Sequence, residues 1–254
     1  MGNYMDYKIY VVSLQNEIKR REIITSRLKS LRLDYEFVNA VDLRNKSHRD
    51  LEDIKQGYEI KSLRDITPGE LGCSLSHKEV YKRIIKDDVK CGIVLEDDAI
   101  LTSGFEKHII DIMKLNISDD IVILGYSKLS ESDQYLFYKK EPIKVKHRVS
   151  TCNLGKVWKD WSCGTVGYLI TKEGVKKMIS KNILSIADDW SMHKNNCDIT
   201  ILHCRPCIVF EDFVNIPSSI ECERKDYMKK NNVVKDIARV IRGIIRHIMM
   251  FFMR

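Results

Sequence analysis

Hydrophobic positions along this chain follow two periods, one typical of strands and one typical of helices. Short apolar, β-branched runs at residues 8–14 and 35–40 predict strands. Between them, residues 17–33 carry apolar side chains at helical spacing and predict a helix. A strand, a helix and a strand within about 30 residues form a βαβ unit, whose strands lie parallel. The first segment of the chain therefore predicts an α/β fold.

The same pattern continues toward the C-terminus. Thr67 can cap a helix, Pro68 suits its first turn, and Glu70 completes the capping-box spacing, so a helix is expected from there to about residue 87. Residues 91–95, 121–124 and 164–170 read as buried strands, the last followed by a helix at 171–180. Residues 199–210 predict a late strand or strand pair, and residues 42–67 a loop with short helical pieces.

The C-terminal segment differs from the rest in charge. Residues 224–254 hold nine Lys/Arg and two Asp/Glu, a net charge of +7, which equals the charge of the whole chain. From residue 233, basic residues recur every three or four positions and apolar residues fill the other side, which predicts a basic amphipathic helix. We therefore expect a neutral globular unit, residues 1–223, and a basic tail, residues 224–254.

Three explanations of the tail are open: contact with nucleic acid, contact with an anionic membrane surface, or packing as an ordinary helix with a charged outer stripe. The body is neutral and shows no interleaving of aromatic and basic residues, which argues against nucleic acid. Lys/Arg beside Ile, Met and Phe favour an anionic membrane surface. No run of 18 apolar residues is present, so no spanning helix is expected.

The composition, with 44% hydrophobic and 31% charged residues, is that of an ordered globular protein. The N-terminus lacks the basic and apolar regions of a secretory signal, so a cytoplasmic location is expected, with reduced thiols. Cys204 and Cys207 have the C-x-x-C spacing of redox and zinc sites, next to His203. Because there is no second such pair and the run is apolar, buried structural thiols are the preferred interpretation.

The strongest chemical signal is the run Glu96-Asp97-Asp98, directly after the apolar strand at residues 91–95. Adjacent carboxylates repel each other, and a bound divalent cation relieves that repulsion. Carboxylate ligands favour Mg²⁺ or Mn²⁺, and the carboxyl end of a central strand is where open α/β sheets bind ligands. The alternative is a solvated acidic turn that caps the next helix.

A second acidic pair, Asp188-Asp189, precedes Trp190. A carboxylate beside an aromatic ring could bind a sugar and accept a hydroxyl proton, or the pair could simply cap a helix that starts near Trp190. His77 lies in the expected helix at 67–87, where it either packs or reaches a ligand. Phosphate-binding glycine loops and the nucleophile-elbow motif are absent from the sequence.

Taken in order, these blocks resemble a known family. The chain contains YVVSLQNEIKRRE, FVNAVD, TPGELGCSLSHKEVYKRI, CGIVLEDDAIL, CGTVGYLITKEGVKKM and IADDW. Over residues 9–220 it resembles glycosyltransferase family 25, the bacterial lipooligosaccharide galactosyltransferases and their relatives, which include collagen galactosyltransferase domains. The specific part is E-L-G-C-x-L-S-H followed about 20 residues later by L-E-D-D.

The resemblance implies a GT-A type fold with a mixed, mostly parallel central sheet flanked by helices. It also implies a UDP-sugar donor, commonly UDP-galactose, an Mn²⁺-type ion or Mg²⁺, and inversion at the anomeric carbon. Its D-x-D-like motif falls on Glu96, Asp97 and Asp98. Asp98 is expected to bind the metal directly with Glu96 in the metal site, and Glu96 or Asp97 to orient the ribose or the metal's waters.

Other family positions carry over to this chain. The expected donor-contacting residues are Ser13, Leu14, Arg21, Ala40, Asp42, Glu70, Ser76 and His77. Ser13 stands where the family has Asn, which removes any contact made by an amide, and Ile186-Ala187 replaces the usual Pro-Val before the second acidic motif. Inversion requires a base that deprotonates the acceptor hydroxyl, and Asp188 is the expected base with Asp189 as the second candidate.

Together these features predict an inverting, metal-dependent transferase that moves galactose from a UDP-sugar to a glycan acceptor in bacterial surface polysaccharide or lipooligosaccharide synthesis. The acceptor is expected to be lipid-linked, and the tail to hold the enzyme on the inner face of the cytoplasmic membrane. The alternative is a non-catalytic module of the same fold that binds nucleotide sugars or glycans.

Overall fold

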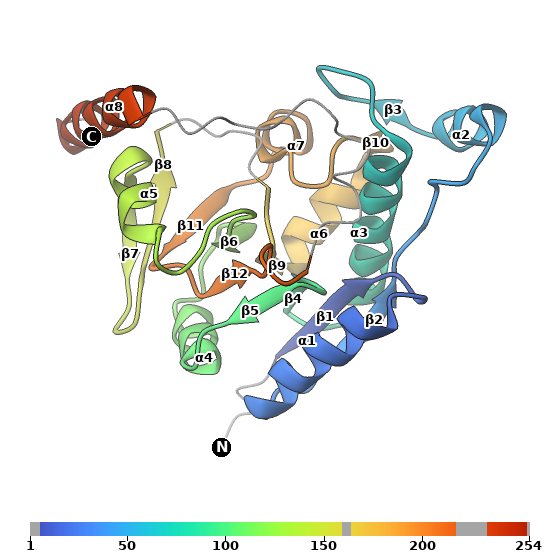
Figure 1. The fold of residues 1–254 in the computed structure, drawn as a ribbon, viewed down its shortest axis with the longest axis horizontal. Coiled ribbons are helices and arrows are strands. Elements are labelled where there is room, and N and C mark those ends of the chain that lie inside the picture. The colour runs from blue at the N-terminus through green and yellow to red at the C-terminus, as the bar shows by residue number, and fades with distance from the viewer. Residues whose placement is uncertain (1–5, 159–163, 217–232, 253–254) are drawn as a thin grey trace.

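An eight-stranded sheet forms the centre of the computed structural model, which describes residues 6–158, 164–216 and 233–252 (Figure 1). Its strand order is β2 (Glu36–Asn39), β1 (Tyr7–Ser13), β4 (Cys91–Glu96), β9 (Gly167–Thr171), β6 (Ile121–Gly125), β11 (Ile201–Arg205), β8 (Asn153–Val157) and β7 (Ile143–Arg148). Two small sheets join β3 (Glu59–Ile60) to β10 (Ile183–Leu184) and β5 (Ala99–Leu101) to β12 (Val209–Glu211).

Strand directions make the central sheet mixed but mostly parallel. β2, β1, β4, β6, β11 and β7 point one way, and only β9 and β8 point the other. The expected βαβ unit is confirmed, because β1 and β2 pair in parallel on either side of α1 (Ile18–Ser30). The α/β class, with helices flanking a mostly parallel sheet, agrees with the GT-A type of fold that the resemblance implies.

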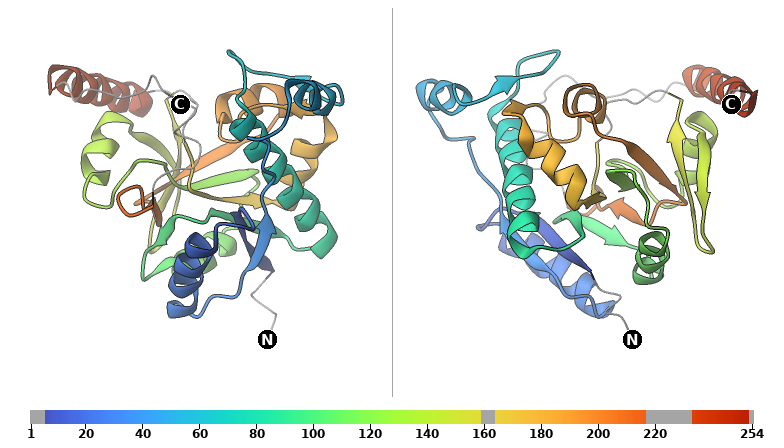
Figure 2. Two further views of the ribbon diagram at one scale, coloured as in Figure 1. Left: turned by 45° about the vertical axis from the view of Figure 1, so that its right-hand side comes forward. Right: turned by 180° about the vertical axis from the view of Figure 1, so that it is seen from behind.

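Helices cover both faces of the sheet (Figure 2). Because successive side chains of a strand point to opposite faces, Ile9 and Val11 of β1 pack with α1 and α4 (Phe105–Lys114), whereas Tyr10 between them packs toward the other face. That other face carries α3 (Pro68–Asp87), α6 (Lys172–Ser180) and α7 (Trp190–Cys197). Two hydrophobic layers therefore enclose the sheet and fix where its strand ends lie.

The start of α3 follows its sequence signal. The Thr67 side chain accepts from the Glu70 amide and the Glu70 carboxylate accepts from the Thr67 amide, so the capping box is formed. The expected loop at residues 42–67 holds the short helix α2 (His48–Lys55) and β3. Ile18, one of the apolar residues at helical spacing in residues 17–33, was expected on the buried face of α1, which is wrong, because its side chain is 63% exposed.

The basic tail forms a helix, α8 (Val233–Phe252), which packs on α5 (Gln134–Lys140) and β7. Gly243 allows a close approach there, since a Cβ at this position would lie 2.0 Å from the Lys139 carbonyl oxygen. Arg246 pairs with Glu141 at 2.9 Å. The expected boundary at residues 223 and 224 lies outside the described residues. Among the helices that the structure describes, none is both long enough and apolar enough to cross a membrane.

Candidate active site

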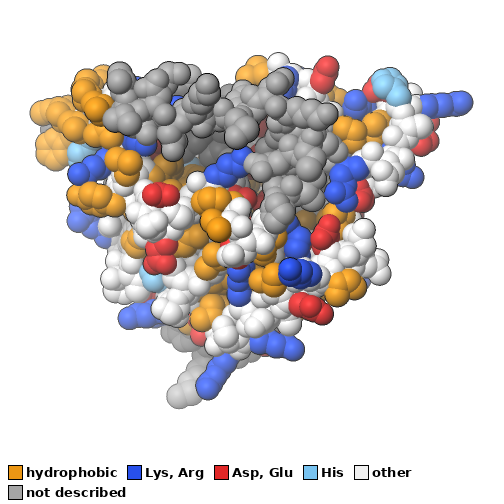
Figure 3. All heavy atoms as spheres, viewed as in Figure 1, with side chains coloured by type: hydrophobic (Ala, Val, Ile, Leu, Met, Phe, Trp, Pro, Cys, Tyr) orange, Lys and Arg blue, Asp and Glu red, His pale blue; other side chains and the backbone are white. Residues whose placement is uncertain are grey.

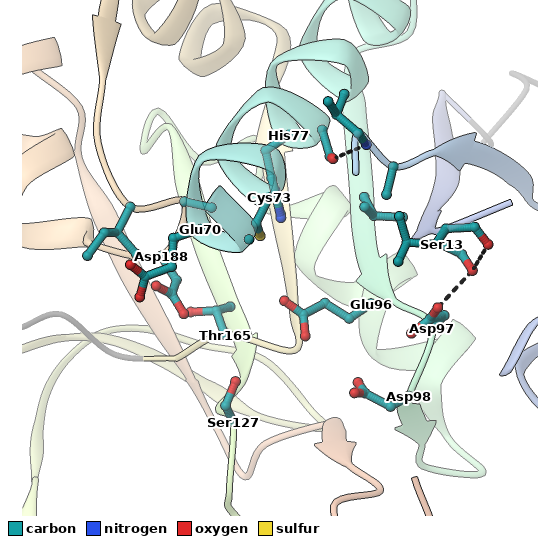
Figure 4. Close-up of a pocket in the computed structure, with 18 of the residues that line it drawn as sticks. Ser13, Glu70, Cys73, His77, Glu96, Asp97, Asp98, Ser127, Thr165 and Asp188 are labelled. Atoms are coloured by element: carbon teal, nitrogen blue, oxygen red, sulfur yellow. Dashed lines mark hydrogen bonds between the residues drawn. The ribbon is translucent and has the colours of Figure 1, made fainter. Parts of the chain in front are cut away.

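One pocket collects most of the residues singled out from the sequence (Figure 4). It has a volume of about 180 Å³ and lies where β1 and β4 end, opposite the first half of α3. Its wall also includes the loops that follow β2 and β6, the segment before α7, and the end of β12. The parallel strands β1, β2, β4 and β6 all bring their carboxyl ends to this side, which is the usual ligand side of an open α/β sheet.

The pocket is strongly acidic. Its lining includes eight carboxylates, Glu17, Asp42, Glu70, Glu96, Asp97, Asp98, Asp188 and Glu211. Among the residues that the structure describes, three basic side chains line the pocket as well: Arg20, Arg44 and Lys128. An anionic ligand such as a diphosphate would be repelled by this surplus unless a cation came with it.

Glu96, the last residue of β4, is followed by Asp97 and Asp98, whose carboxylates have different partners. Asp97 is held on both oxygens: Oδ2 accepts from Ser13 Oγ at 2.7 Å, and Oδ1 accepts from Arg20 Nε at 2.7 Å. Asp98 Oδ2 accepts from Arg20 Nη2 at 2.9 Å. Asp98 Oδ1 is buried and has no hydrogen-bond partner among the residues that the structure describes. Asp98 thus keeps one oxygen for a ligand.

Burial sets the protonation of this group. It raises the pKa of Glu96 well above its usual range, and repulsion from Asp98, Glu211 and Asp188 adds to the effect. Burial also raises the pKa of Asp98 to about 6, although the Arg20 guanidinium opposes the shift. A divalent cation relieves both the desolvation and the repulsion, so the free oxygen of Asp98 and the carboxylate of Glu96 fit a hard ion such as Mn²⁺ or Mg²⁺.

Glu211 is a site residue that the sequence reasoning missed. It ends β12, lies in the pocket wall, is buried, and its Oε2 accepts from the Lys128 amide at 2.5 Å. Its charge contributes to the raised pKa of Glu96 and of Asp98. The only local signal was an acidic residue directly after the apolar run at residues 199–210.

Arg20 and Arg21, which are neighbours on α1, bind different groups. Of the residues expected to contact the donor, Ser13 and Leu14 line the pocket, but Arg21 does not appear in its wall. Arg21 instead donates to the Ser13 carbonyl at 2.9 Å, to the Leu14 carbonyl at 3.1 Å and to Asn39 Oδ1 at 2.7 Å. It therefore ties the end of β1 to the end of β2, whereas Arg20, which the sequence reasoning passed over, holds the acidic residues.

The expected donor residues after β2 lie in the pocket wall. Ala40 and Asp42 both line the pocket. Arg44 donates two hydrogen bonds to the Asp42 carboxylate, from Nε at 2.8 Å and from Nη2 at 2.6 Å. The hydrogen bond from Arg44 lowers the pKa of Asp42 to about 2. Ser76 also lines the pocket, and its Oγ accepts from the Val41 amide at 2.8 Å. This bond fixes the loop after β2 against α3.

Two further residues of α3, Glu70 and His77, face the pocket. Glu70 accepts from Arg64 Nη1 at 2.8 Å in addition to its capping bond. His77 Nδ1 lies 2.7 Å from the Tyr168 hydroxyl. Burial lowers the pKa of His77 to about 4, so its imidazole is neutral at physiological pH.

The structure separates the two acids of the second motif. Asp188 lines the pocket. Asp189 is the N-cap of α7, where its Oδ1 accepts from the Met192 amide at 3.1 Å. The helix-cap explanation left open by the sequence therefore holds for Asp189, whereas Asp188 is the acid that lines the pocket. Trp190 is buried behind them and donates from Nε1 to Thr165 Oγ1 at 2.6 Å.

Buried thiols are found at the C-x-x-C pair as expected. Cys204 and Cys207 are both buried, and neither forms a disulfide. Neither residue lines the pocket. The pair therefore belongs to the sheet's interior rather than to the candidate site.

The sequence matches one family model and several known proteins. A family model described as glycosyltransferase family 25 (LPS biosynthesis protein) matches residues 6–192. Procollagen galactosyltransferase 2 of Homo sapiens is 28% identical over 184 residues, which cover 69% of this chain but only 28% of that protein. A protein of Haemophilus influenzae whose name describes it as a glycosyltransferase is 26% identical over 222 residues, 83% of this chain and 72% of that protein. The crystal structure of mannose-1-phosphate geranyltransferase from Thermus thermophilus gives a TM-score of 0.43 at 9% identity, covering 78% of this chain and 73% of that one.

Proposed function

The chain belongs to glycosyltransferase family 25 (LPS biosynthesis protein), and we propose that it is a metal-dependent transferase that moves a sugar, galactose, from a UDP-sugar to a glycan acceptor with inversion. One observation carries the proposal. At the end of β4, in the wall of the pocket, Asp98 keeps a buried oxygen without a partner among the described residues, beside Glu96, whose pKa is raised. This arrangement has the chemistry of a cation site beside a nucleotide diphosphate.

Asp98 and Glu96 would hold the ion, with Glu211 next to them. When bound, Mn²⁺ or Mg²⁺ supplies positive charge that stabilises the diphosphate as it leaves the sugar. Arg20 positions the site, because it bonds to both Asp97 and Asp98 and so fixes the two carboxylates in place. Ser13 restrains Asp97 from the side of β1. These contacts prepare the carboxylates before any ligand arrives.

Asp188 is our proposed base. An inverting transfer needs one group that accepts the proton of the acceptor hydroxyl as that hydroxyl attacks the anomeric carbon. Figure 4 shows Asp188 on the side of the pocket near Glu70, away from Asp97 and Asp98. A sugar held between the two sides would have its leaving group near the cation site and its opposite face toward Asp188.

A UDP-release assay tests the proposal. The chain is incubated with a panel of nucleotide sugars, with and without Mn²⁺, alongside Asp98→Asn. We expect metal-dependent release from one donor, UDP-galactose, and a loss of at least 100-fold in Asp98→Asn, with UDP binding followed by calorimetry. The alternative, a non-catalytic nucleotide-sugar module, is favoured if the protein binds UDP-sugars but releases no UDP with any acceptor glycan offered.

The partner of α8 is proposed to be an anionic membrane surface carrying a lipid-linked acceptor on the cytoplasmic face. Figure 3 shows hydrophobic side chains gathered at the upper left, where α8 lies in the same view of Figure 1. The exposed apolar residues of this helix are Ile237, Ile241, Ile244, Ile245, Ile248, Met249, Phe251 and Phe252. Phe251 is 83% exposed. A lipid surface would cover this face, and neighbouring Lys/Arg would meet the headgroups.

A further inference from the structure

A mixed cluster of possible metal ligands lies beside the proposed cation site. Cys73 and His77 are four residues apart on α3, so they share one face of the helix. Figure 4 shows both side chains facing the pocket, with the carboxylate of Glu96 reaching toward them from β4. One ligand atom from each of Cys73, His77 and Glu96 lies within 4.8 Å of the other two.

The ligand types of this cluster differ from those of the carboxylates around Asp98. Thiolate and imidazole are ligands of Zn²⁺, whereas Mn²⁺ and Mg²⁺ prefer oxygen. In a tetrahedral zinc site the bond lengths of about 2.0–2.3 Å place neighbouring ligand atoms roughly 3.5 Å apart. The three atoms lie within 4.8 Å of one another, so binding would bring them closer by up to about 1.3 Å.

The surroundings of His77 prepare it to coordinate. Its imidazole is buried and lies in the wall of the pocket. Nδ1 lies 2.7 Å from the Tyr168 hydroxyl, which is 3.1 Å from the Tyr81 hydroxyl. When Nδ1 donates its proton to Tyr168, Nε2 keeps the lone pair that a metal needs. Hydrogen bonds of this kind commonly orient metal-binding histidines.

We propose that Cys73, His77 and Glu96 form a Zn²⁺ site, bound through the thiolate, an imidazole nitrogen and a carboxylate oxygen. The fourth position is left to water or a ligand in the pocket. Binding releases the thiol proton of Cys73 and any proton on Glu96 to solvent. In this proposal, Cys73 and His77, which lie on one face of α3, bind a metal ion in addition to packing.

This site has a consequence for the proposed transferase, and the consequence rests on the proposed function. Glu96 belongs both to the zinc cluster and to the carboxylates that would hold Mn²⁺ or Mg²⁺. A single carboxylate drawn toward Cys73 and His77 is removed from Asp98. Zinc and the hard ion therefore oppose each other, and zinc should inhibit sugar transfer.

The test of binding uses Co²⁺ as a spectroscopic substitute for zinc and needs no activity. The full chain is freed of metal, titrated with Co²⁺, and followed by absorbance. We expect a thiolate-to-cobalt charge-transfer band in the near ultraviolet, visible bands with tetrahedral intensity, and loss of both when Zn²⁺ is added. Cys73→Ser should abolish the charge-transfer band, and His77→Gln should weaken Co²⁺ binding at least tenfold.

Matched variants make the result decisive. Cys91→Ser and Cys207→Ser change buried cysteines outside the pocket, and both should keep the band. Near-ultraviolet circular dichroism confirms that Cys73→Ser is folded. Absence of a charge-transfer band in the folded wild-type chain overturns the proposal. So does a band that survives Cys73→Ser but disappears in Cys207→Ser.

The inhibition arm is measured separately, as UDP release at fixed Mn²⁺ with increasing Zn²⁺. The wild type should lose activity as the Co²⁺-binding site fills, and Cys73→Ser should need at least tenfold more Zn²⁺ to lose the same fraction of its own zinc-free activity. If cobalt binds as expected but no donor yields UDP, the zinc site stands and the transferase proposal fails.

Discussion

Arg20 uses only one oxygen of Asp98: its Nη2 lies 2.9 Å from Oδ2, while Oδ1 stays buried with no hydrogen bond to any described residue. The same arginine reaches Asp97 through Nε. The guanidinium therefore holds two adjacent carboxylates in place and leaves Oδ1 of Asp98 open to a ligand. It also keeps the pKa of Asp98 from rising beyond about 6 under the effect of burial.

Replacing this arginine should weaken ion-dependent nucleotide binding. In Arg20→Gln the pKa of Asp98 is expected to rise further, so that Mn²⁺ must displace a proton at pH 7. The loss of charged hydrogen bonds, worth about 1.5–3 kcal/mol each, suggests a decrease of at least tenfold in Mn²⁺-dependent UDP affinity by calorimetry. Affinity should recover partly at higher pH, where Asp98 is deprotonated. Tighter binding would show that repulsion between Arg20 and the ion dominates.

Arg21→Gln is the matched control. This residue bonds to the carbonyls of Ser13 and Leu14 and lies outside the pocket wall. Its loss should lower the melting temperature, because it joins the ends of β1 and β2, while the dependence of UDP binding on Mn²⁺ remains.

The two acids of the second motif should separate catalysis from stability. Asp188→Asn removes the proposed base, and a loss of about 100-fold or more in kcat is expected with UDP affinity unchanged. Asp189→Ala removes the cap of α7 and should cost about 1 kcal/mol of unfolding free energy, with kcat within a few-fold of the wild type. Near-normal turnover in Asp188→Asn would remove this residue from the mechanism.

Glu211→Gln tests a carboxylate beyond the matched segment of residues 6–192. The glutamine carbonyl can still accept from the Lys128 amide, so the end of β12 should stay in place. Only the charge is lost, and with it part of the attraction for a divalent cation. We expect Mn²⁺ affinity to fall about tenfold while the melting temperature stays unchanged or rises. An unchanged Mn²⁺ affinity would exclude Glu211 from the ion site.

Local patterns predicted the parts of the fold that short-range physics determines. The βαβ unit follows from apolar periodicity, and the start of α3 follows from the hydrogen bonds that Thr67 and Glu70 exchange. The strands β7 and β8 were not predicted, because each is short and carries few apolar residues. Their place in the sheet comes from pairing: β7 pairs with β8, and β8 pairs with β11. The pairing of β8 with β11 joins residues far apart in the sequence and leaves little trace in either segment.

The residues of the candidate site were likewise predictable only where a local sequence pattern marks them. Glu96, Asp97 and Asp98 stand out because three acids after a buried strand need an explanation. Glu211 comes from a later part of the chain than these acids, and the pairing of β12 with β5 helps to place it at the pocket. The choice between Arg20 and Arg21 depends on the rotation of α1, which a pattern of apolar residues fixes too loosely to assign neighbouring side chains.

The apolar face of α8 should carry membrane binding. Burying one isoleucine contributes about 1.5–3 kcal/mol, so Ile241→Glu or Ile244→Glu should reduce co-sedimentation with anionic phosphatidylglycerol vesicles at least tenfold. Leu63→Glu, at a side chain that is 93% exposed outside α8, makes the same charge change and should not reduce it. Truncation after residue 232 should abolish binding. Equal sedimentation of the truncated and full chains would refute the membrane surface as the partner.

Stability in acid should depend on His203, which does not line the pocket. Its Nδ1 is 2.6 Å from the Tyr126 hydroxyl in the interior of the sheet, and burial, with help from the charge of Arg205, lowers its pKa to about 3. The unfolded chain has a histidine pKa of about 6.5 and so binds more protons between pH 6.5 and 3. The free energy of unfolding is therefore independent of this group above pH 6.5. It decreases as the pH falls below 6.5, by up to about 1.4 kcal/mol per pH unit for this group.

His203→Gln should therefore lower the melting temperature at pH 8 but flatten its decline between pH 6.5 and 4, measured by circular dichroism. His48→Gln, at an exposed histidine of α2, should leave the slope as it is, and an equal decline in His203→Gln and the wild type would rule out His203 as a source of acid sensitivity.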